Sequence, residues 1–335
     1  MRRCIVAAVT FAVMLCGRSA TSLFAQSNDP GCENRTLVST GGQFPRNPQT
    51  LVVRWTGFSN FELVYKRQVI LLDAYFDRGS IYPSLGFKAA DIRRANVILL
   101  GHGHHDHMSD AASVAIRTGA VVVGAAVTAE KLLAQNVDPK QVRSVTGKGG
   151  EELKFQYFTV EPILGRHGAP PPDITATFNQ ALQRTTPSPT PEQSAEQLAI
   201  RERGTSDPRV AAEGTVAYLI TFDDGFRIMY RDSGGTVTDY EKAAMARIGR
   251  VDVAIGAVAA SVLPALTSQQ ALEYMRTYKP DVYIPAHHDG SINDLWRATE
   301  PLFQALKDEN PKIVTISKAY REPICFDMAR RPSTK

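Results

Sequence analysis

A run at residues 96–100 that is apolar after Asn96 ends directly at the segment Gly101-His102-Gly103-His104-His105-Asp106-His107. A run of this length without alternating polar residues is typical of a strand buried on both faces of a sheet. Four of the seven histidines in the chain follow that run at once. The sequence therefore predicts a buried strand that delivers a cluster of imidazole rings to one point.

The other three histidines also lie in short, separate places. One is His167, and the remaining two, His287 and His288, follow a second apolar run at residues 282–285. Imidazole is the commonest side-chain metal ligand, because a neutral ring nitrogen is a good donor near neutral pH. A chain that confines its histidines to three places in this way is expected to use them as metal ligands.

Strand and helix patterns recur along the chain. Strands are expected at residues 51–55, 61–65, 68–72, 96–100, 121–124, 153–160, 215–222, 226–230, 251–255, 282–285 and 312–316. Helices are expected at residues 108–117, 128–135, 192–203, 268–278 and 293–307, with a further one beginning near Asp239. Strands followed by helices in both halves predict an α/β fold, a four-layer αββα sandwich with two sheets inside and helices outside.

The N-terminus predicts a secretory signal. Arg2 and Arg3 precede an apolar run at residues 5–15 that is too short to span a bilayer, and cleavage after Ala20 or Ala25 is open. The expected divisions are a signal peptide at 1–25, an N-terminal arm at 26–50, one domain at 51–320 and a tail at 321–335. The expected location is periplasmic or secreted.

A proline-rich insertion interrupts the domain at residues 169–213. Proline at this density opposes regular structure, although residues 192–203 can form a helix with Pro191 in its first turn. A long irregular insertion in a compact domain is usually functional or disordered. A lid over the site and a disordered surface loop are both open.

Charge and cysteine content narrow the class of protein. The net charge is +4, and the leader alone carries three arginines and no acid, so +1 remains without it, which gives no basic field for nucleic acid. No segment after the leader is long and apolar enough to cross a membrane. Removing the leader leaves Cys32 and Cys325, for which a disulfide and two free thiols are both open.

The spacing in the first cluster suits two metal ions. His102 and His104 lie two residues apart, which on a loop directs both rings toward one point, and Asp106 with His107 can face a second point nearby. Zinc and similar ions accept nitrogen and carboxylate oxygen together. Two such ions about 3.5–4 Å apart, sharing a water, lower the pKa of that water toward neutrality.

The motif His102-x-His104-x-Asp106-His107 resembles the signature of the metallo-β-lactamase-fold hydrolases. The resemblance continues in the expected order with His167, Asp232 in Arg231-Asp232-Ser233-Gly234, and His287. Upstream, Trp55-Thr56-Gly57-Phe58-Ser59 and Leu71-Leu72-Asp73 resemble the opening strands of the family, so that about residues 51–316 are covered. The opening segment looks closest to the branch of sugar-phosphate lactonases and lipid phosphodiesterases.

The resemblance implies a role for each ligand. Two sets of three would each hold one metal ion: His102, His104 and His167 for the first, and Asp106, His107 and His287 for the second. Asp232 would bridge the ions, a shared hydroxide would attack the substrate, and Asp106 would be the catalytic residue that receives or orients a proton. The resemblance implies two divalent ions, with Zn²⁺ expected and Mn²⁺ or Fe²⁺ as alternatives.

Several of these residues can also have roles other than metal binding. His167 can be a surface histidine, and Asp232 can form a turn before Ser-Gly-Gly. Arg231 stands where the family often has glycine; it is expected in a surface salt bridge or beside a substrate anion. Gly101 stands where the family often has threonine or serine.

Neighbouring residues are expected to support the site. His105 is predicted to face solvent or to stand behind the ligands, and His288 is predicted behind the ligands or touching substrate. Asp73 is expected to hold the loop beneath the site. Tyr75, Phe76 and Tyr82 are expected to pack in the core or to line the pocket.

The expected activity is hydrolysis of a phosphodiester, lactone or related ester of a small molecule or lipid. Asp232 counts against a true β-lactamase, since those enzymes generally lack this carboxylate, and export counts against RNA processing. A β-lactamase or thioesterase-type hydrolase of the same fold, and a catalytically inactive metal-binding protein, are the alternatives. No nucleic-acid partner is expected, and the sequence does not indicate an oligomeric state.

Overall fold

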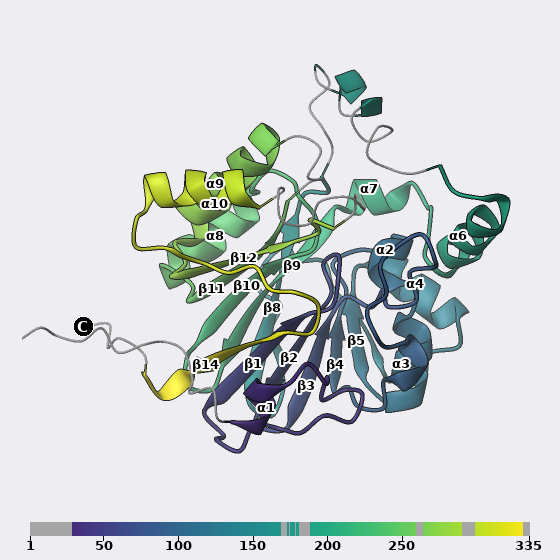
Figure 1. The fold of residues 1–335 in the computed structure, drawn as a ribbon, viewed down its shortest axis with the longest axis horizontal. Helices are drawn as coiled ribbons and strands as arrows, with labels where there is room; N and C mark the ends of the chain where they lie inside the picture. Colours follow the sequence, from purple (N-terminus) through teal and green to yellow (C-terminus); the bar gives the residue numbers. More distant parts are fainter. Residues whose placement is uncertain are drawn as a thin grey trace, which may run out of the picture.

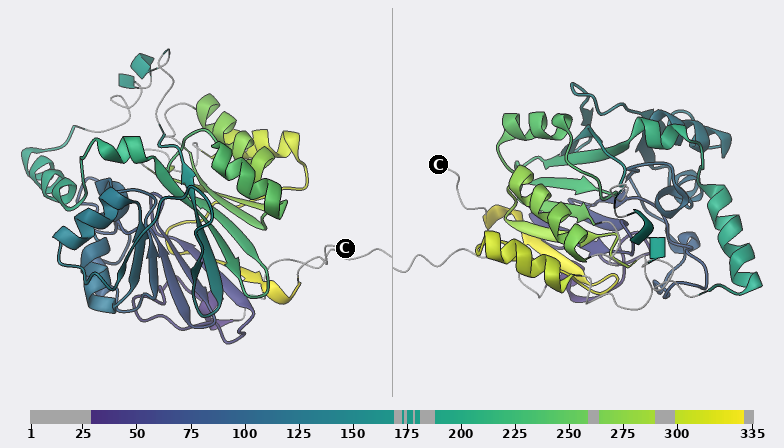
Figure 2. Two further views of the ribbon diagram at one scale, coloured as in Figure 1. Left: turned by 180° about the vertical axis from the view of Figure 1, so that it is seen from behind. Right: turned by 90° about the horizontal axis from the view of Figure 1, so that it is seen from above.

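Two sheets stacked face to face form the centre of the molecule (Figure 1). The computed structural model describes residues 29–168, 188–258, 264–289 and 299–330, with a few more between 169 and 187. Helices cover the outer face of each sheet, as the views in Figure 2 also show. The predicted four-layer αββα arrangement is confirmed.

The first sheet has the order β14-β1-β2-β3-β4-β5-β6. Its strands are β1 (Thr50–Trp55), β2 (Phe61–Tyr65), β3 (Gln68–Leu72), β4 (Val97–Leu99), β5 (Val121–Gly124), β6 (Val142–Ser144) and β14 (Pro323–Asp327). The strands from β3 to β6 are parallel, whereas β1 runs antiparallel to both β2 and β14. The expected strands at 51–55, 61–65 and 68–72 are confirmed almost to the residue.

The second sheet has the order β13-β12-β11-β10-β9-β8-β7. Its strands are β7 (Leu153–Lys154), β8 (Phe158–Gly165), β9 (Thr215–Phe222), β10 (Arg227–Arg231), β11 (Val253–Ala257), β12 (Val282–Ala286) and β13 (Val314–Thr315). The expected strand at 153–160 is two antiparallel strands, β7 and β8, joined by a turn. The strands from β10 to β13 are parallel.

Apolar side chains fill three layers of core. One cluster lies between the sheets and includes Leu63 and Leu99 from the first and Ile228 and Ile284 from the second. A second cluster lies beneath α3 (Ala111–Thr118) and α4 (Ala126–Ala134), and a third beneath α8 (Asp239–Ile248), α9 (Pro264–Tyr278) and α10 (Glu300–Glu309). Burial of strands on both faces explains their continuous apolar runs.

The helix expected at 108–117 is interrupted. The structure has α2 (His105–Met108) and then α3, with Ser109 and Asp110 between them. Asp110 holds this break, because its carboxylate accepts the N–H groups of Phe76 and Asp77, at 2.7 and 2.8 Å, and its own N–H donates to Ala74. These contacts join distant parts of the chain, so a local helical pattern does not reveal them. Residues 290–298, where another helix was expected to begin, lie outside the described residues.

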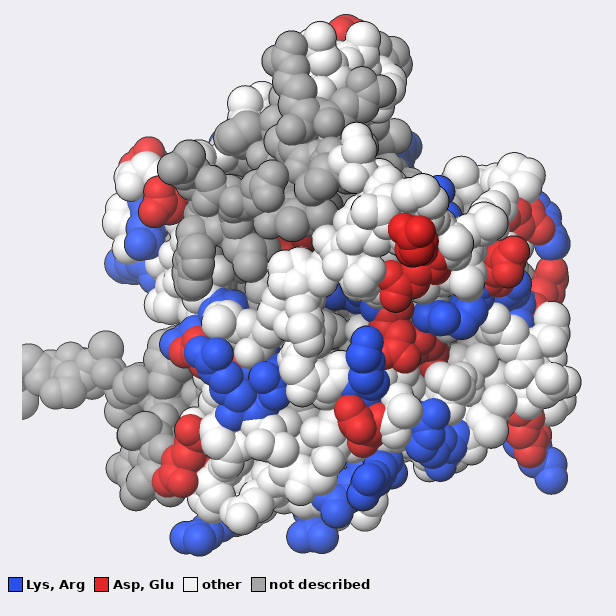
Figure 3. Space-filling model, turned by 45° about the vertical axis from the view of Figure 1, so that its right-hand side comes forward, with Lys and Arg blue, Asp and Glu red and all other residues white. Residues whose placement is uncertain are grey.

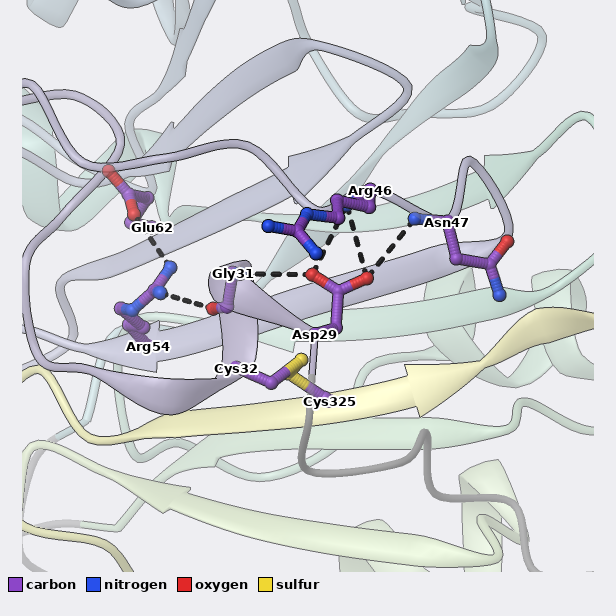
Figure 4. Close-up of a disulfide and its surroundings, with 8 residues drawn as sticks. All are labelled: Asp29, Gly31, Cys32, Arg46, Asn47, Arg54, Glu62 and Cys325. Atoms are coloured by element: carbon purple, nitrogen blue, oxygen red, sulfur yellow. Dashed lines mark hydrogen bonds and ion pairs between the residues drawn. A yellow bond between two sulfur atoms is a disulfide. The ribbon is translucent and has the colours of Figure 1, made fainter.

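The N-terminal segment is tied to the domain at several points. Short helix α1 (Pro30–Glu33) carries Cys32, which forms a disulfide with Cys325 on β14 (Figure 4). The buried carboxylate of Glu62 accepts the N–H groups of Val38 and Ser39 and pairs with Arg54. The predicted N-terminal arm at 26–50 is therefore packed against the domain from residue 29 onward.

Several sequence expectations fall on residues that the structure does not describe. The predicted signal peptide and most of the insertion between 169 and 187 lie outside the described residues, as do residues 331–335.

Within the described ranges, none of the helices has the length and apolarity needed to cross a membrane. On the face in Figure 3, acidic and basic side chains are intermixed.

The later half of the insertion is described and ordered. It contains α6 (Pro191–Arg203) and α7 (Arg209–Glu213). Thr190 caps α6 in a capping box with Gln193, and Pro191 occupies the first turn, as the sequence predicted. This half of the insertion therefore contains regular helical structure.

Candidate metal centre

The predicted ligands come from the carboxyl ends of strands in both sheets. The histidine-rich loop follows β4, Asp232 follows β10 directly, and His287 follows β12 directly. His167 lies two residues beyond β8, which runs in the same direction as β10 because both are antiparallel to β9. Parallel strands end at one edge of a sheet, so the fold brings residues as far apart in sequence as His102 and His287, 185 positions, into one place.

Three histidines form the first group. His102 Nε2 lies 2.9 Å from His104 Nδ1, and His167 Nε2 lies 3.2 Å from the same atom. Donor atoms around a tetrahedral zinc ion with bonds of 2.0–2.1 Å lie about 3.3 Å apart. The structure therefore brings these three predicted rings close enough together to surround a single small cation.

The second group combines a carboxylate with two imidazoles. Asp106 Oδ2 lies 3.3 Å from His287 Nε2 and 3.6 Å from His107 Nε2. One ligand atom from each of Asp106, His107 and His287 lies within 4.8 Å of the other two. The structure therefore brings the second predicted set together as well.

Asp232 lies between the two groups and is fully buried. Its Oδ2 is 2.5 Å from His102 Nδ1 and 3.4 Å from His107 Nδ1. Its Oδ1 is buried without a hydrogen-bond partner among the described residues. A buried carboxylate oxygen without a partner costs free energy unless a cation or donor meets it. This orphaned oxygen fits a cation placed between the groups.

Carboxylates hold the ligand rings in one orientation. His107 Nδ1 lies 2.7 Å from Asp73 Oδ2, and His102 Nδ1 faces Asp232. With Nδ1 donating to a carboxylate, the Nε2 atom of each ring is left free as a ligand atom. Asp73 also accepts the N–H of Gly101 at 3.0 Å, so it lies beneath the loop as predicted.

Burial and charge set the protonation of these rings. Burial, with neighbouring His102, lowers the pKa of His104 to about 3 and that of His167 to about 4. Burial opposes a charge on His107 as well, but Asp106, Asp73 and Asp232 raise the pKa of His107 to about 10. His104 and His167 are therefore neutral at pH 7, the form that binds metal, whereas His107 retains a proton that a metal ion must displace.

Arg231 corrects one expectation. The sequence predicted a surface salt bridge or a contact with a substrate anion, but Arg231 is only 1% exposed. Its guanidinium lies 3.5 Å from Glu241 of α8 and over the ring of Tyr274 of α9. It also donates to the carbonyl of Arg166, 3.2 Å away. Arg231 thus binds the backbone next to His167 from the side of the loop that faces away from the ligands.

The surplus histidines lie beside the two groups. His105 is half-buried, its ring is edge-on to Tyr75, and Nδ1 lies 3.9 Å from Asp106. His288 is 3% exposed and stacks on Trp55, with ring centroids 4.3 Å apart. His288 therefore stands behind the ligands, and the expected substrate contact has no support in the described residues.

The aromatic residues near the site pack mainly with one another. Tyr75 and Phe76 are buried, as expected for core residues. Tyr82 is half-buried and lies edge-on to Phe58, whose own ring lies edge-on to His287. Ile200 of α6 belongs to the same cluster.

The ordered half of the insertion packs directly against the histidine-rich loop. Thr205 donates its N–H to the carbonyl of Gly103 at 2.8 Å. Gly204 lies so close to His105 that a Cβ at this position would be 2.4 Å from its Cα. Arg203 reaches the carbonyl of Ser109 and the carboxylate of Asp110. Residues 200–205 therefore form one wall beside the predicted centre.

Sequence reasoning missed four supporting residues: Ser59, Arg78, Asp289 and Tyr320. Ser59 belongs to the Trp-Thr-Gly-Phe-Ser segment and Asp289 follows His287-His288, so both had a local signal. Arg78 and Tyr320 have none, because their contacts with Asp289 depend on the fold.

The sequence profile of the family described as "Beta-lactamase superfamily domain" matches residues 68–288, which is more than half of the chain. The chain belongs to this superfamily. The matched residues begin at β3 and include every predicted ligand of this superfamily member.

Similar proteins agree with that placement. A metal-dependent hydrolase of Brucella canis is 29% identical over 117 residues, which cover 35% of this chain and 47% of the relative. A metal-dependent hydrolase of Shouchella clausii is 36% identical over 117 residues, with coverage of 35% and 48%. The chain spans about half the length of the curated relatives it matches.

Solved structures share the superfamily fold. Igni18, a metallo hydrolase from Ignicoccus hospitalis, has a TM-score of 0.56 at 14% identity and covers 83% of this chain and 98% of its own. CmlA, a diiron β-hydroxylase from Streptomyces venezuelae, has a TM-score of 0.53 at 15% identity, with coverage of 84% and 55%. An isothiocyanate hydrolase from Delia radicum gut bacteria has a TM-score of 0.52 at 13% identity, with coverage of 82% and 98%. At these identities the likeness concerns the fold alone.

Proposed function

We propose that this chain is an exported metal-dependent hydrolase with two divalent ions, Zn²⁺ in the first instance, in one centre. The observation that carries the proposal is the overlap of three ligand groups. One contains His102, His104 and His167, one contains His102, His107 and Asp232, and one contains Asp106, His107 and His287. Because His102 and His107 each belong to two groups, the donors form one continuous set rather than separate sites.

The chemistry of the donors supports this reading. Imidazole nitrogens and carboxylate oxygens together suit zinc, and also manganese or iron(II). The unpartnered Oδ1 of Asp232 supports its role as the bridging carboxylate. When bound, such a pair of ions supplies a hydroxide at neutral pH and stabilises charge on the leaving oxygen.

The residues of the chain would orient the ligands and move a proton. The carboxylates of Asp232 and Asp73 fix the Nδ1 sides of His102 and His107. Although burial opposes it, His107 and His287 hold the pKa of Asp106 well below its usual range. Asp106 is therefore ionised at neutral pH, as the predicted catalytic residue that accepts or orients a proton must be.

The proposed substrate is a phosphodiester, lactone or related ester of a small molecule or lipid. The resemblance of the Trp55-Thr56-Gly57-Phe58-Ser59 segment to lactonases and phosphodiesterases supports this class. The same fold also carries a diiron β-hydroxylase and an isothiocyanate hydrolase, so the fold does not select the reaction. An assay panel therefore has to include an isothiocyanate, a thioester and a β-lactam.

We also propose export and a single domain that extends past the predicted residues 51–320 to include β14, which pairs with β1, with the insertion acting as a lid beside the centre. The Cys32–Cys325 disulfide supports export, because disulfides persist mainly in oxidising compartments. Contacts of residues 200–205 with the histidine-rich loop support the lid. Replacing residues 188–203 with a short linker should change the relative rates on large and small esters, and unchanged ratios would contradict the lid.

The central experiment combines metal analysis with the substrate panel. The full chain, recovered from the periplasm, is expected to hold two divalent ions and to hydrolyse an ester of the proposed class. Asp232→Ala should lower metal content or turnover at least tenfold, because it removes a ligand with a buried charge. Asp223→Ala is the matched control, since Asp223 pairs with Lys66 at a hairpin turn away from the ligands.

Three results would contradict the proposal or a part of it. A metal-loaded chain that is inactive on the whole panel would favour a catalytically inactive metal-binding protein. An Asp232→Ala variant with two ions and normal turnover would remove the bridging assignment. Recovery of the chain only from the cytoplasm, with both thiols free, would contradict export.

A further inference from the structure

The loop between β1 and β2, residues 56–60, contains no predicted metal ligand but contacts two of them. The hydroxyl of Ser59 donates to the backbone carbonyl of Asp232 at 2.6 Å. The carbonyl of Phe58 accepts the N–H of His287 at 2.8 Å, and the two rings meet edge to face at 5.0 Å. Each contact runs from the first sheet to a ligand at the end of a strand in the second sheet.

Both partners in the Phe58–His287 contact have unfavourable backbone conformations. Phe58 has φ of +47° and His287 has φ of +60°. Residues with large side chains rarely occupy this left-handed region, and they remain there only where surrounding contacts determine the conformation. Contacts with neighbouring residues must therefore hold the backbones of Phe58 and His287 in these conformations.

Asp289 supplies that contact. Its Oδ1 accepts the N–H of Phe58 at 2.8 Å, while the carbonyl of Phe58 accepts the N–H of His287. The peptide groups on both sides of Phe58 are thus fixed, one by Asp289 and the other by the ligand itself.

Asp289 is in turn held by two side chains from other parts of the chain. Its Oδ2 accepts hydrogen bonds from Arg78 at 2.7 Å and from the hydroxyl of Tyr320 at 2.6 Å. The side chains of Arg78 and Asp289 are 2% and 1% exposed, so this is a buried ion pair. Arg78 is anchored further by the carbonyl of Pro83 at 2.8 Å.

Gly57 provides the space for this arrangement. A Cβ atom at Gly57 would lie 2.5 Å from Nη1 of Arg78, the atom that pairs with Asp289. The φ of Gly57 is also +90°, which favours glycine. The Trp-Thr-Gly-Phe-Ser segment therefore has one physical explanation: it admits Arg78, turns at Phe58 and reaches Asp232 through Ser59.

We propose that Asp289, together with Arg78 and Tyr320, is a positioning residue that fixes His287 toward the second metal ion through the backbone of Phe58. The inference rests on the metal centre of the proposed function. It assigns the last ligand of the second group a support from residues that bind no metal themselves. Loss of this support should weaken the second metal site more than the first, whose ligands lie on other loops.

The test compares two buried ion pairs of the same kind. Asp289→Asn keeps the size of the side chain but leaves the guanidinium of Arg78 buried without a counter-charge. The matched control is Glu62→Gln, which breaks the pair between Arg54 and Glu62 at 3.2 Å, where the side chains are 1% and 0% exposed. That pair contacts the N-terminal segment and none of the predicted ligands.

Zinc affinity and thermal unfolding are measured for both variants, with zinc titrated against a chelator of known affinity. Both variants should unfold at lower temperature than the wild type, because each leaves a buried charge unpaired. Only Asp289→Asn should weaken one of two zinc sites, by about 10–100-fold. Glu62→Gln should bind both ions like the wild type.

Tyr320→Phe is the second variant. It removes one hydrogen bond to Asp289 and keeps the ion pair, so it should fold and weaken the same zinc site by a smaller factor. It decides the question if Asp289→Asn does not fold. Normal zinc affinity in both variants overturns the proposal, and so does normal zinc affinity in Tyr320→Phe alone when Asp289→Asn does not fold. An equal loss in Glu62→Gln, or a wild-type chain that binds no zinc, also overturns it. Because the measurement is zinc affinity, a chain that binds two ions and hydrolyses nothing contradicts only the proposed function.

Discussion

Gly101 and Asp232 are in such close contact that no side chain fits between them. A Cβ atom on Gly101 would lie 1.9 Å from Cγ of Asp232 and 2.0 Å from its Oδ2. The absence of a side chain at Gly101 therefore decides where the buried carboxylate of Asp232 can lie. This explains physically why the position before the first histidine is glycine in this chain.

Gly101→Ala is accordingly expected to displace Asp232. Forcing extra atoms into a packed site typically costs about 1–3 kcal/mol of stability, and a displaced carboxylate should lower metal affinity at least tenfold. Chemical denaturation and zinc titration measure the two effects. In an Asp232→Ala background the space is free, so Gly101→Ala should then have little further effect on stability. A full additional loss in that background would show that the collision lies elsewhere.

Asp73→Asn is expected to disturb the loop that carries the histidines. Asp73 accepts hydrogen bonds from both Gly101 N–H and His107 Nδ1, whereas an asparagine amide has only one acceptor atom. Metal affinity or turnover should fall by about 10–100-fold. Asp110→Asn is the control, because Asp110 is also buried and accepts the N–H groups of Phe76 and Asp77 but touches no predicted ligand. Equal metal affinity in Asp73→Asn and Asp110→Asn would contradict the orienting role.

Metal binding should release at least one proton near pH 7. In the metal-free protein, burial opposes the charge on His107, but the carboxylates of Asp106, Asp73 and Asp232 raise its pKa to about 10. A metal ion needs the free Nε2 atom and must displace this proton. Calorimetry at pH 7–8 in buffers of different ionisation enthalpy measures the number released, and a value of zero would argue against His107 as a ligand.

The same raised pKa predicts how the stability of the metal-free protein depends on pH. The folded pKa of about 10 lies above the unfolded value near 6.5, so the contribution of His107 is complete below pH 6.5. It is lost as pH rises toward 10. His107→Gln should therefore show a flatter decline in unfolding free energy between pH 6.5 and 10 than the wild type does. Parallel curves would show that His107 is not charged in the metal-free fold.

The candidate ligands could be predicted from sequence because their signals are local. The buried run before His102 and the spacing from His102 to His107 identify both an element and a chemistry within a dozen residues. Arg231 could not be predicted in this way, since an arginine at the end of a strand has the appearance of a surface residue. Arg231 is buried because the packing of helices α8 and α9 places Glu241 and Tyr274 against its side chain.

Contacts between residues far apart in sequence explain the other features that the sequence did not predict. Arg78 and Asp289 are 211 positions apart, and nothing near either residue indicates its partner. The break between α2 and α3 depends likewise on Asp110 accepting N–H groups more than 30 positions away. Strand positions and candidate ligands follow from periodicity and motif, whereas buried ion pairs and side-chain caps follow from tertiary packing.

The disulfide should stabilise the fold without affecting the metal centre. Cys32 and Cys325 are separated by 293 positions, and Cys325 lies opposite Val52 in the ladder between β14 and β1. Removing a native disulfide typically costs about 2–5 kcal/mol, chiefly because the unfolded chain gains freedom. Cys32→Ser combined with Cys325→Ser should lower the free energy of unfolding in urea by that amount. Zinc affinity should stay unchanged, because the backbone ladder between β1 and β14 remains to hold the C-terminal strand. Intact mass first confirms the bond in the wild type. Equal stability of the variant and the wild type would then show that the disulfide constrains the chain little. A loss of zinc affinity in the variant would show that the C-terminal strand needs the disulfide to bring Tyr320 to Asp289.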